Sequence, residues 1–93
     1  FLTSKNSVIQ DNIISSNKGP FGCGIRLNQW SDNNQIINNI INSNHYCGID
    51  IFLSEYNNIT NNIIDLNEGY GIRLHTSSNN IIQNINIDCS SNR

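Results

Sequence analysis

Four short segments of this chain share the form Ile-x-x-Asn-Ile and repeat at nearly regular spacing. The copies lie 27, 23 and 22 residues apart and begin at Ile9, Ile36, Ile59 and Ile81. A second motif, Gly-Ile-x-Leu or Gly-Ile-x-Ile, begins at Gly24, Gly48 and Gly71. A repeat of about this length indicates a solenoid, in which each unit buries its apolar face only against its neighbours.

The residue types that fill the repeat favour strands over helices. Asn occurs 20 times and Ile 18 times in 93 residues, whereas Ala and Met are absent. Strong helix formers are therefore scarce, and the dominant apolar residue is β-branched. We predict an all-β fold, a parallel β-helix (β-solenoid) of about four coils of 22–27 residues. A leucine-rich repeat is the alternative, because its period overlaps this one.

The apolar residues are expected to form columns of like side chains inside the coil. Alternation along a strand places residues i and i+2 on the same face. For the glycine motif, the predicted inward residues are Cys23, Ile25, Leu27, Cys47, Ile49, Ile51, Tyr70, Ile72 and Leu74. For the other motif they are Ile9, Ile36, Ile59 and Ile81, with Ile13, Ile40, Ile63 and Ile85 four residues later. Each buried Ile contributes about 1.5–3 kcal/mol.

Asparagine recurs at one point of each coil, where we expect a corner. The equivalent residues are Asn12, Asn39, Asn62 and Asn84. Asn tolerates the left-handed backbone conformation that a sharp corner needs. Stacked side-chain amides can also hydrogen-bond from coil to coil. The sequence therefore predicts asparagine ladders at the corners.

The segment Gly-Ile-Arg-Leu-His-Thr-Ser-Ser-Asn-Asn-Ile-Ile-Gln-Asn (71–84) resembles the parallel β-helix repeat of NosD-like periplasmic proteins and of related carbohydrate-binding proteins and sugar hydrolases. The resemblance implies a right-handed, single-stranded solenoid with three short parallel sheets. It also implies an extracellular, cell-surface or periplasmic location. We treat 1–93 as a single solenoid segment. Aligning Leu2 with Leu74 places residue 1 within a strand, so we expect the segment to be an excerpt of a longer chain.

A candidate ligand-binding surface lies on the outer side of the glycine-motif strands. Arg26, Asp50 and Arg73 occupy equivalent outward positions, with Phe52 and His75 two residues further along their strands. The arginines could pair with an acidic polysaccharide, while aromatic rings stack on the sugars. The candidate stacking residues are Phe52, Trp30 and Tyr56. The alternative is a charge ladder that only stabilises the sheet.

Catalytic residues are not expected within this segment. Glycoside hydrolysis needs two acids facing one cleft, and the outward strand positions offer only Asp50. The other acids are expected in turns or corners, namely Asp32, Glu55, Asp65, Glu68 and Asp88. We therefore predict a non-catalytic scaffold or glycan-binding segment. The alternatives are part of a polysaccharide lyase, hydrolase or C5-epimerase, and a solenoid that associates end to end through unpaired strand edges.

Other partners and cofactors find little support in the sequence. Five basic residues and a net charge of −2 leave no electrostatic footprint for nucleic acid, and no apolar run is long enough to span a membrane. The spacing of Cys23, Cys47 and Cys89 matches no zinc motif. We expect no metal and no cofactor. Whether Cys23 and Cys47 are bonded is left open.

Overall fold

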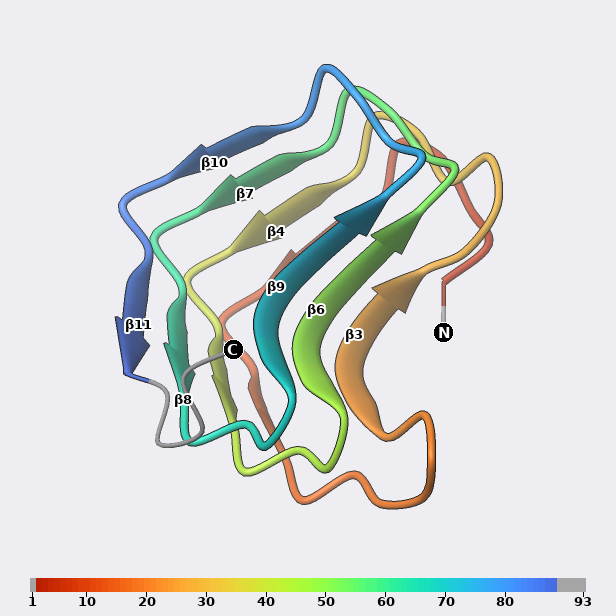
Figure 1. The fold of residues 1–93 in the computed structure, drawn as a ribbon. Coiled ribbons are helices and arrows are strands. Elements are labelled where there is room, and N and C mark those ends of the chain that lie inside the picture. The colour runs from red at the N-terminus through yellow and green to blue at the C-terminus, as the bar shows by residue number, and fades with distance from the viewer. Residues whose placement is uncertain (1, 89–93) are drawn as a thin grey trace.

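The computed structural model describes residues 2–88, and this part of the chain contains strands and turns but no helix. The chain winds as a flat-sided coil, and each coil adds one short strand to each of three sheets (Figure 1). The strands are β1 (Val8–Gln10), β2 (Ile13–Ser15), β3 (Cys23–Leu27), β4 (Gln35–Ile37), β5 (Ile40–Asn42), β6 (Cys47–Phe52), β7 (Asn58–Thr60), β8 (Ile63–Asp65), β9 (Tyr70–His75), β10 (Ile81–Gln83) and β11 (Asn86–Asp88).

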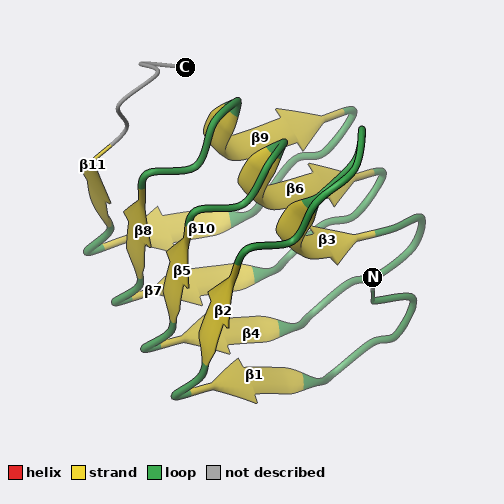
Figure 2. Cartoon of the chain, turned by 90° about the horizontal axis from the view of Figure 1, so that it is seen from below, coloured by secondary structure: helices red, strands yellow, loops and turns green. Residues whose placement is uncertain are grey.

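All strand pairs are parallel, and every strand pairs with the equivalent strand of the next coil. The sheets have the orders β1-β4-β7-β10, β2-β5-β8-β11 and β3-β6-β9. Figure 2 shows the three sheets side on, with the coils stacked one above another. The predicted parallel β-helix is confirmed, and the leucine-rich alternative is wrong. Within residues 2–88, two sheets have four strands and the third has three, so this part of the chain makes about three full turns rather than four.

The core is a set of vertical columns, as expected from the repeat. Ile36 lies between Ile9 and Ile59, and Ile49 lies between Ile25 and Ile72. The core side chains of the central coils are almost completely buried: Leu27, Ile36, Ile41, Ile49, Ile51, Ile59 and Ile64. Because no helix covers the sheets in residues 2–88, these columns supply most of the apolar burial. No helix in this range could cross a membrane.

The prediction that Ile13, Ile40 and Ile63 point inward is wrong. Ile13 is 74% exposed, and the other two are also exposed. The buried column is formed by the residues that follow them, Ile14, Ile41 and Ile64. A corner residue with positive φ precedes this segment in each coil: Asp11, Asn38, Asn61 and Asn84 have φ values of 61°, 58°, 58° and 51°. The corner turns the chain, so strand alternation does not continue through it.

The asparagine ladders are confirmed, but their members are not the corner residues. Asn39 and Asn62 follow the left-handed residues and point into the coil. The Asn39 side-chain amide donates to Asn62 Oδ1 at 3.1 Å, and the Asn39 backbone N–H donates to the same oxygen at 2.8 Å. Asn12 donates to Asn39 in the same way. Two further ladders run along Asn17–Asn44–Asn67 and Asn34–Asn57–Asn80.

The last coil is shifted by one residue from the predicted alignment. Ile82, not Ile81, pairs with Ile59. Asn84 is a left-handed corner residue, and Ile85 takes the position that Asn62 occupies one coil below. Ile85 is only partly buried, although it packs against the core. It carries no amide, so it ends the ladder.

The strands β3, β6 and β9 bend at Gly24, Gly48 and Gly71. This bend determines which of their side chains face outward. A Cβ on Gly48 would lie 2.7 Å from Ile64 Cγ2, and one on Gly24 would lie 2.5 Å from Ile41 Cγ2. These glycines therefore face the core, and the residue before each one faces outward. Tyr70 is exposed and Cys23 is half-buried, so the prediction that they point inward is wrong. Cys47 is completely buried, but it lies beside Asp50 and outside the core cluster of isoleucines and Leu27. The strand curves after the glycine, so Ile25 and Ile49 also enter the core.

Candidate functional site

The side of β3, β6 and β9 that faces away from the isoleucine core is here called the outer sheet face, although Cys47 and Asp50 on it are almost completely buried. It comprises Cys23, Arg26, Cys47, Asp50, Tyr70 and Arg73, with Phe52 and His75 at the strand ends. Arg26 pairs in register with Asp50, and Asp50 with Arg73. Regular alternation would place the cysteines and the arginines on opposite faces of their strands. The bend at each glycine places both on the outer sheet face, which therefore has more reactive side chains than alternation predicts.

The charged column forms one ion pair rather than a regular ladder. Arg26 Nε lies 3.4 Å from Asp50 Oδ2, and the Asp50 side chain is only 1% exposed. The second carboxylate oxygen, Asp50 Oδ1, is buried and has no hydrogen-bond partner. Arg73 donates instead to the hydroxyl of Tyr46. Only the Arg26–Asp50 pair of the alternative charge ladder is therefore present, between β3 and β6, while Arg73 contacts Tyr46.

A row of aromatic rings crosses the coils beside the arginines. The ring centroids of Phe21 and Tyr46 are 6.1 Å apart, and those of Tyr46 and Tyr70 are 6.0 Å apart, both edge to face. The Arg73 guanidinium lies 5.6 Å from the Tyr46 ring and 5.4 Å from the Tyr70 ring. Arg26 lies 6.0 Å from Phe21. Phe21 is 61% exposed and Tyr70 is 39% exposed, so both can contact a ligand.

Sequence reasoning missed this aromatic row as a unit. Phe21, Tyr46 and Tyr70 precede the motif glycines by three, two and one residues. The changing offset hides their proximity, because they occupy different register positions: Tyr70 pairs with Cys47, so Tyr46 lies one position earlier, and only the turn before β3 is longer than the others. The available signal was the presence of one aromatic residue just before each Gly-Ile motif.

The other predicted site residues divide into two groups. Phe52 and His75 are neighbours in register, with ring centroids 4.9 Å apart. Trp30 and Tyr56 lie in the turns after β3 and β6, both exposed and both with positive φ. The structure therefore brings Phe52 and His75 to the end of the outer sheet face, and it leaves Trp30 and Tyr56 in the turns.

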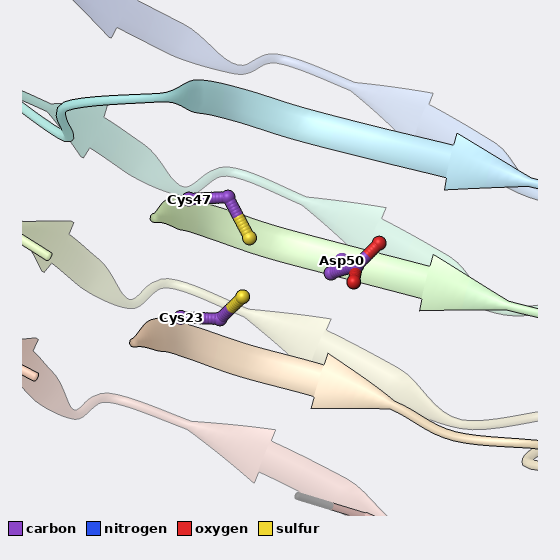
Figure 3. Close-up of side chains that lie close together, drawn as sticks. All are labelled: Cys23, Cys47 and Asp50. Atoms are coloured by element: carbon purple, nitrogen blue, oxygen red, sulfur yellow. The ribbon is translucent and has the colours of Figure 1, made fainter. Parts of the chain in front are cut away.

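Cys23 and Cys47 lie beside Asp50 on the outer sheet face (Figure 3). Both cysteines are free thiols. A hydrogen bond from the Cys47 thiol lowers the pKa of Cys23, although burial opposes this effect. The same hydrogen bond, together with burial, strongly raises the pKa of Cys47. Cys89 lies outside the described residues.

The remaining acids do not converge on Asp50. Asp32 lies 3.4 Å from Lys5, and Glu68 lies 3.1 Å from His45, both at exposed turns. Asp65 and Asp88 were predicted in turns or corners, but they end β8 and β11. The corner lies at Asn61 and Asn84, so the residues that follow it form the strands β8 and β11. These strands belong to a different sheet from β6, which carries Asp50. Residues 2–88 enclose no pocket.

Comparison with known proteins gives one match. A family model described as the right-handed beta helix region matches residues 1–91. No curated protein and no solved structure matched the chain. The match covers all three sheets, so it concerns the coil architecture as a whole.

Proposed function

The chain belongs to the right-handed β-helix family, and we propose that this β-helix scaffold binds an acidic glycan on its outer sheet face without transforming it. The glycan chain lies across the coils, along the row of Phe21, Tyr46 and Tyr70. Sugar rings pack on the exposed aromatic surface, and Arg73 pairs with sugar carboxylates. Arg–carboxylate pairing is strong and directional.

The observation that carries this proposal is the placement of Arg73 against the half-buried ring of Tyr46 and the exposed ring of Tyr70. Its guanidinium lies within 5.6 Å of two ring centroids, which holds it beside the stacking surface. Tyr46 and Tyr70 offer both an apolar ring and a hydroxyl, a combination suited to partly wet binding surfaces. Arg26, Asp50 and Arg73 together carry two positive charges and one negative charge, which favours an anionic ligand.

The non-catalytic assignment rests on the state of Asp50. Its side chain is 1% exposed and paired with Arg26, so it does not reach a substrate on the surface. Glycosidase chemistry needs a second carboxyl group about 5–9.5 Å away. Among residues 2–88 the other carboxylates lie in turns or on another sheet.

The proposal includes a location and a mode of association. Acidic polysaccharides are met outside the cytoplasm, so we place the protein in the periplasm, at the cell surface or in the extracellular space. Leu74, Ile82 and Ile87 of the last coil are 42%, 39% and 47% exposed. These side chains continue the core columns, which supports end-to-end association with a second copy.

Calorimetry with a polyuronate and with a neutral polysaccharide tests the binding proposal. We expect binding to the polyuronate that weakens as salt is added, since screening reduces the charge attraction. Tyr70→Ala and Arg73→Gln should each weaken binding about tenfold, which corresponds to loss of one aromatic or charged contact of about 1.4 kcal/mol. No unsaturated or shortened product should appear.

Tyr56→Ala is the control, because Tyr56 is even more exposed than Tyr70 (60% against 39%) but lies in a turn. It should leave affinity unchanged. The proposal is wrong if neither polysaccharide binds, or if Tyr56→Ala and Tyr70→Ala reduce affinity equally. If the protein cleaves or epimerises the polyuronate, the binding proposal is wrong and the protein is a polysaccharide lyase, hydrolase or epimerase.

A further inference from the structure

Cys23, Cys47 and Asp50 form a cluster that neither the family match nor the glycan proposal uses. One ligand atom from each residue, the two sulfurs and a carboxylate oxygen, lies within 4.8 Å of the others. Figure 3 shows the two thiols on adjacent strands with Asp50 further along β6. We propose that these three side chains bind a thiophilic divalent cation, with Zn²⁺ as the best fit.

The geometry of the cluster suits a tetrahedral ion. With Zn–S bonds of about 2.3 Å, two sulfurs bound to one tetrahedral zinc lie about 3.8 Å apart. The observed separations are within 4.8 Å. Small rotations of the side chains, which move the ligand atoms by about 1 Å, would bring all three atoms to bonding distance from the ion. Cys23 is only half-buried, which leaves a fourth position for water on the solvent side.

A second observation concerns the carboxylate of Asp50 itself. Asp50 is almost fully buried, yet its Oδ1 has no hydrogen-bond partner. A buried carboxylate oxygen without a partner is costly, and coordination of a cation would satisfy it. Oδ2 would keep its contact with the Arg26 guanidinium, 3.4 Å away. Metal-bound carboxylates commonly have such a partner on the other oxygen.

The charges also balance. Two thiolates and one carboxylate carry −3, while Zn²⁺ and the Arg26 guanidinium carry +3. Binding releases the two thiol protons to solvent and forms two Zn–S bonds, with no change in oxidation state. Because both thiols must lose their protons to bind the ion, binding should strengthen as the pH rises.

The sequence alone gave no sign of this site. The two cysteines are 24 residues apart and match no zinc spacing. The coil brings them into register as Cα partners. The same register also permits a disulfide, since paired strands place Cα atoms within bonding range. The experiment must therefore separate metal binding from oxidation.

Cobalt titration of the fully reduced chain tests the proposal. A Cys89→Ser background removes the third thiol, and Co²⁺ reports thiolate ligation by charge-transfer absorption and tetrahedral geometry by its visible bands. We expect one Co²⁺ per chain, displaced by Zn²⁺. Cys23→Ser and Cys47→Ala should each abolish the charge-transfer band of the bound ion or weaken binding at least 100-fold. Asp50→Asn should weaken binding about 10–100-fold.

Asp65→Asn is the matched control, because Asp65 Oδ1 is also buried without a partner but lies on β8. It should leave cobalt affinity unchanged. Far-UV circular dichroism establishes that each variant is folded, and the half-buried Cys23 position is the safer of the two cysteine substitutions. The proposal is overturned if the reduced chain gives no charge-transfer band, or if Asp50→Asn and Asp65→Asn bind cobalt alike. Disulfide formation in air despite equimolar Zn²⁺ would also overturn it.

Discussion

At the scale of single residues, neighbouring asparagines perform different tasks. Asn38 adopts a left-handed conformation at a corner, whereas Asn39 is buried and donates to Asn62 in the next coil. The first task depends on the tolerance of Asn for positive φ. The second depends on a side chain that both donates and accepts hydrogen bonds. Only the ladder residue satisfies buried backbone groups, so the two positions should differ in their effect on stability.

Asn62→Ala should lower the free energy of unfolding by about 3 kcal/mol. The substitution removes the acceptor for the Asn39 N–H and the donor to the Ile36 carbonyl, 2.9 Å away. Buried groups that lose a partner cost about 1–3 kcal/mol each. Urea denaturation followed by circular dichroism measures the change. Asn42→Ala, at an outward position that ends β5, is the control and should cost less than about 0.5 kcal/mol. Equal effects of the two substitutions would contradict the ladder account.

At the scale of elements, the outer sheet face depends on the close approach of a glycine to the core. Gly48 sits against Ile64 and the Gly71 carbonyl, and the strand bends directly after it. The bend turns Ile49 inward, while Cys47 and Asp50 share the outer side. A regular strand would place Cys47 and Asp50 on opposite faces. The candidate metal cluster therefore exists because the strand is not regular.

Gly48→Ala should destabilise the fold by about 1–3 kcal/mol, the usual cost of overpacking. Its Cβ would lie 2.6 Å from the Gly71 carbonyl oxygen, and backbone cannot move away cheaply. Gly71→Ala is the matched comparison. Its nearest contact is Ile87 Cγ2 at 3.1 Å, a side chain of the last coil, so its cost should be below about 1 kcal/mol. Thermal and urea denaturation of both variants measure the difference. A larger loss for Gly71→Ala would refute this explanation of the bend.

At the scale of the whole molecule, burial decreases from the central coils to the end coils. Ile59 and Ile64 are at most 1% exposed, but Ile82 and Ile87, their partners one coil above, are 39% and 47% exposed. Solenoid units are stabilised by their neighbours, and the exposed Ile82 and Ile87 offer an apolar surface on which a further unit can stack. Parallel edge strands also present unpaired backbone groups.

Sedimentation velocity at increasing concentration tests the end-to-end association that we propose. We expect reversible growth beyond the monomer, because stacking would cover both the apolar columns and the strand edges. Ile87→Lys should weaken this association at least tenfold by placing a charge in the contact. Ile63→Lys is the control, since Ile63 is similarly exposed at 44% but faces sideways. A strict monomer at every concentration, or equal effects of the two lysines, would exclude stacking by this surface.

The candidate site was only partly predictable from the sequence. The register of Arg26, Asp50 and Arg73 followed from the spacing of the Gly-Ile motifs, and the structure has this register. The side chains that these three residues contact could not be predicted from the motif spacing. Arg73 contacts Tyr46, which precedes its own glycine motif by a different offset from Tyr70. The turns before β6 and β9 have the same length, so motif spacing does not reveal this contact, and no repeat pattern encodes where a turn side chain points.

The sequence by itself determined the parallel coil, because like residues at a constant period can bury their apolar faces only by stacking on one another. It also determined the asparagine ladders, since stacked amides are the means to satisfy the backbone at each corner. The tertiary structure alone decided which isoleucine of each Ile-Ile pair is buried and which side the cysteines face. Both depend on backbone torsion at a single residue, a left-handed corner or a bend after glycine. Such a residue changes which side chains of the following strand point into the core, although the repeat pattern in the sequence stays the same.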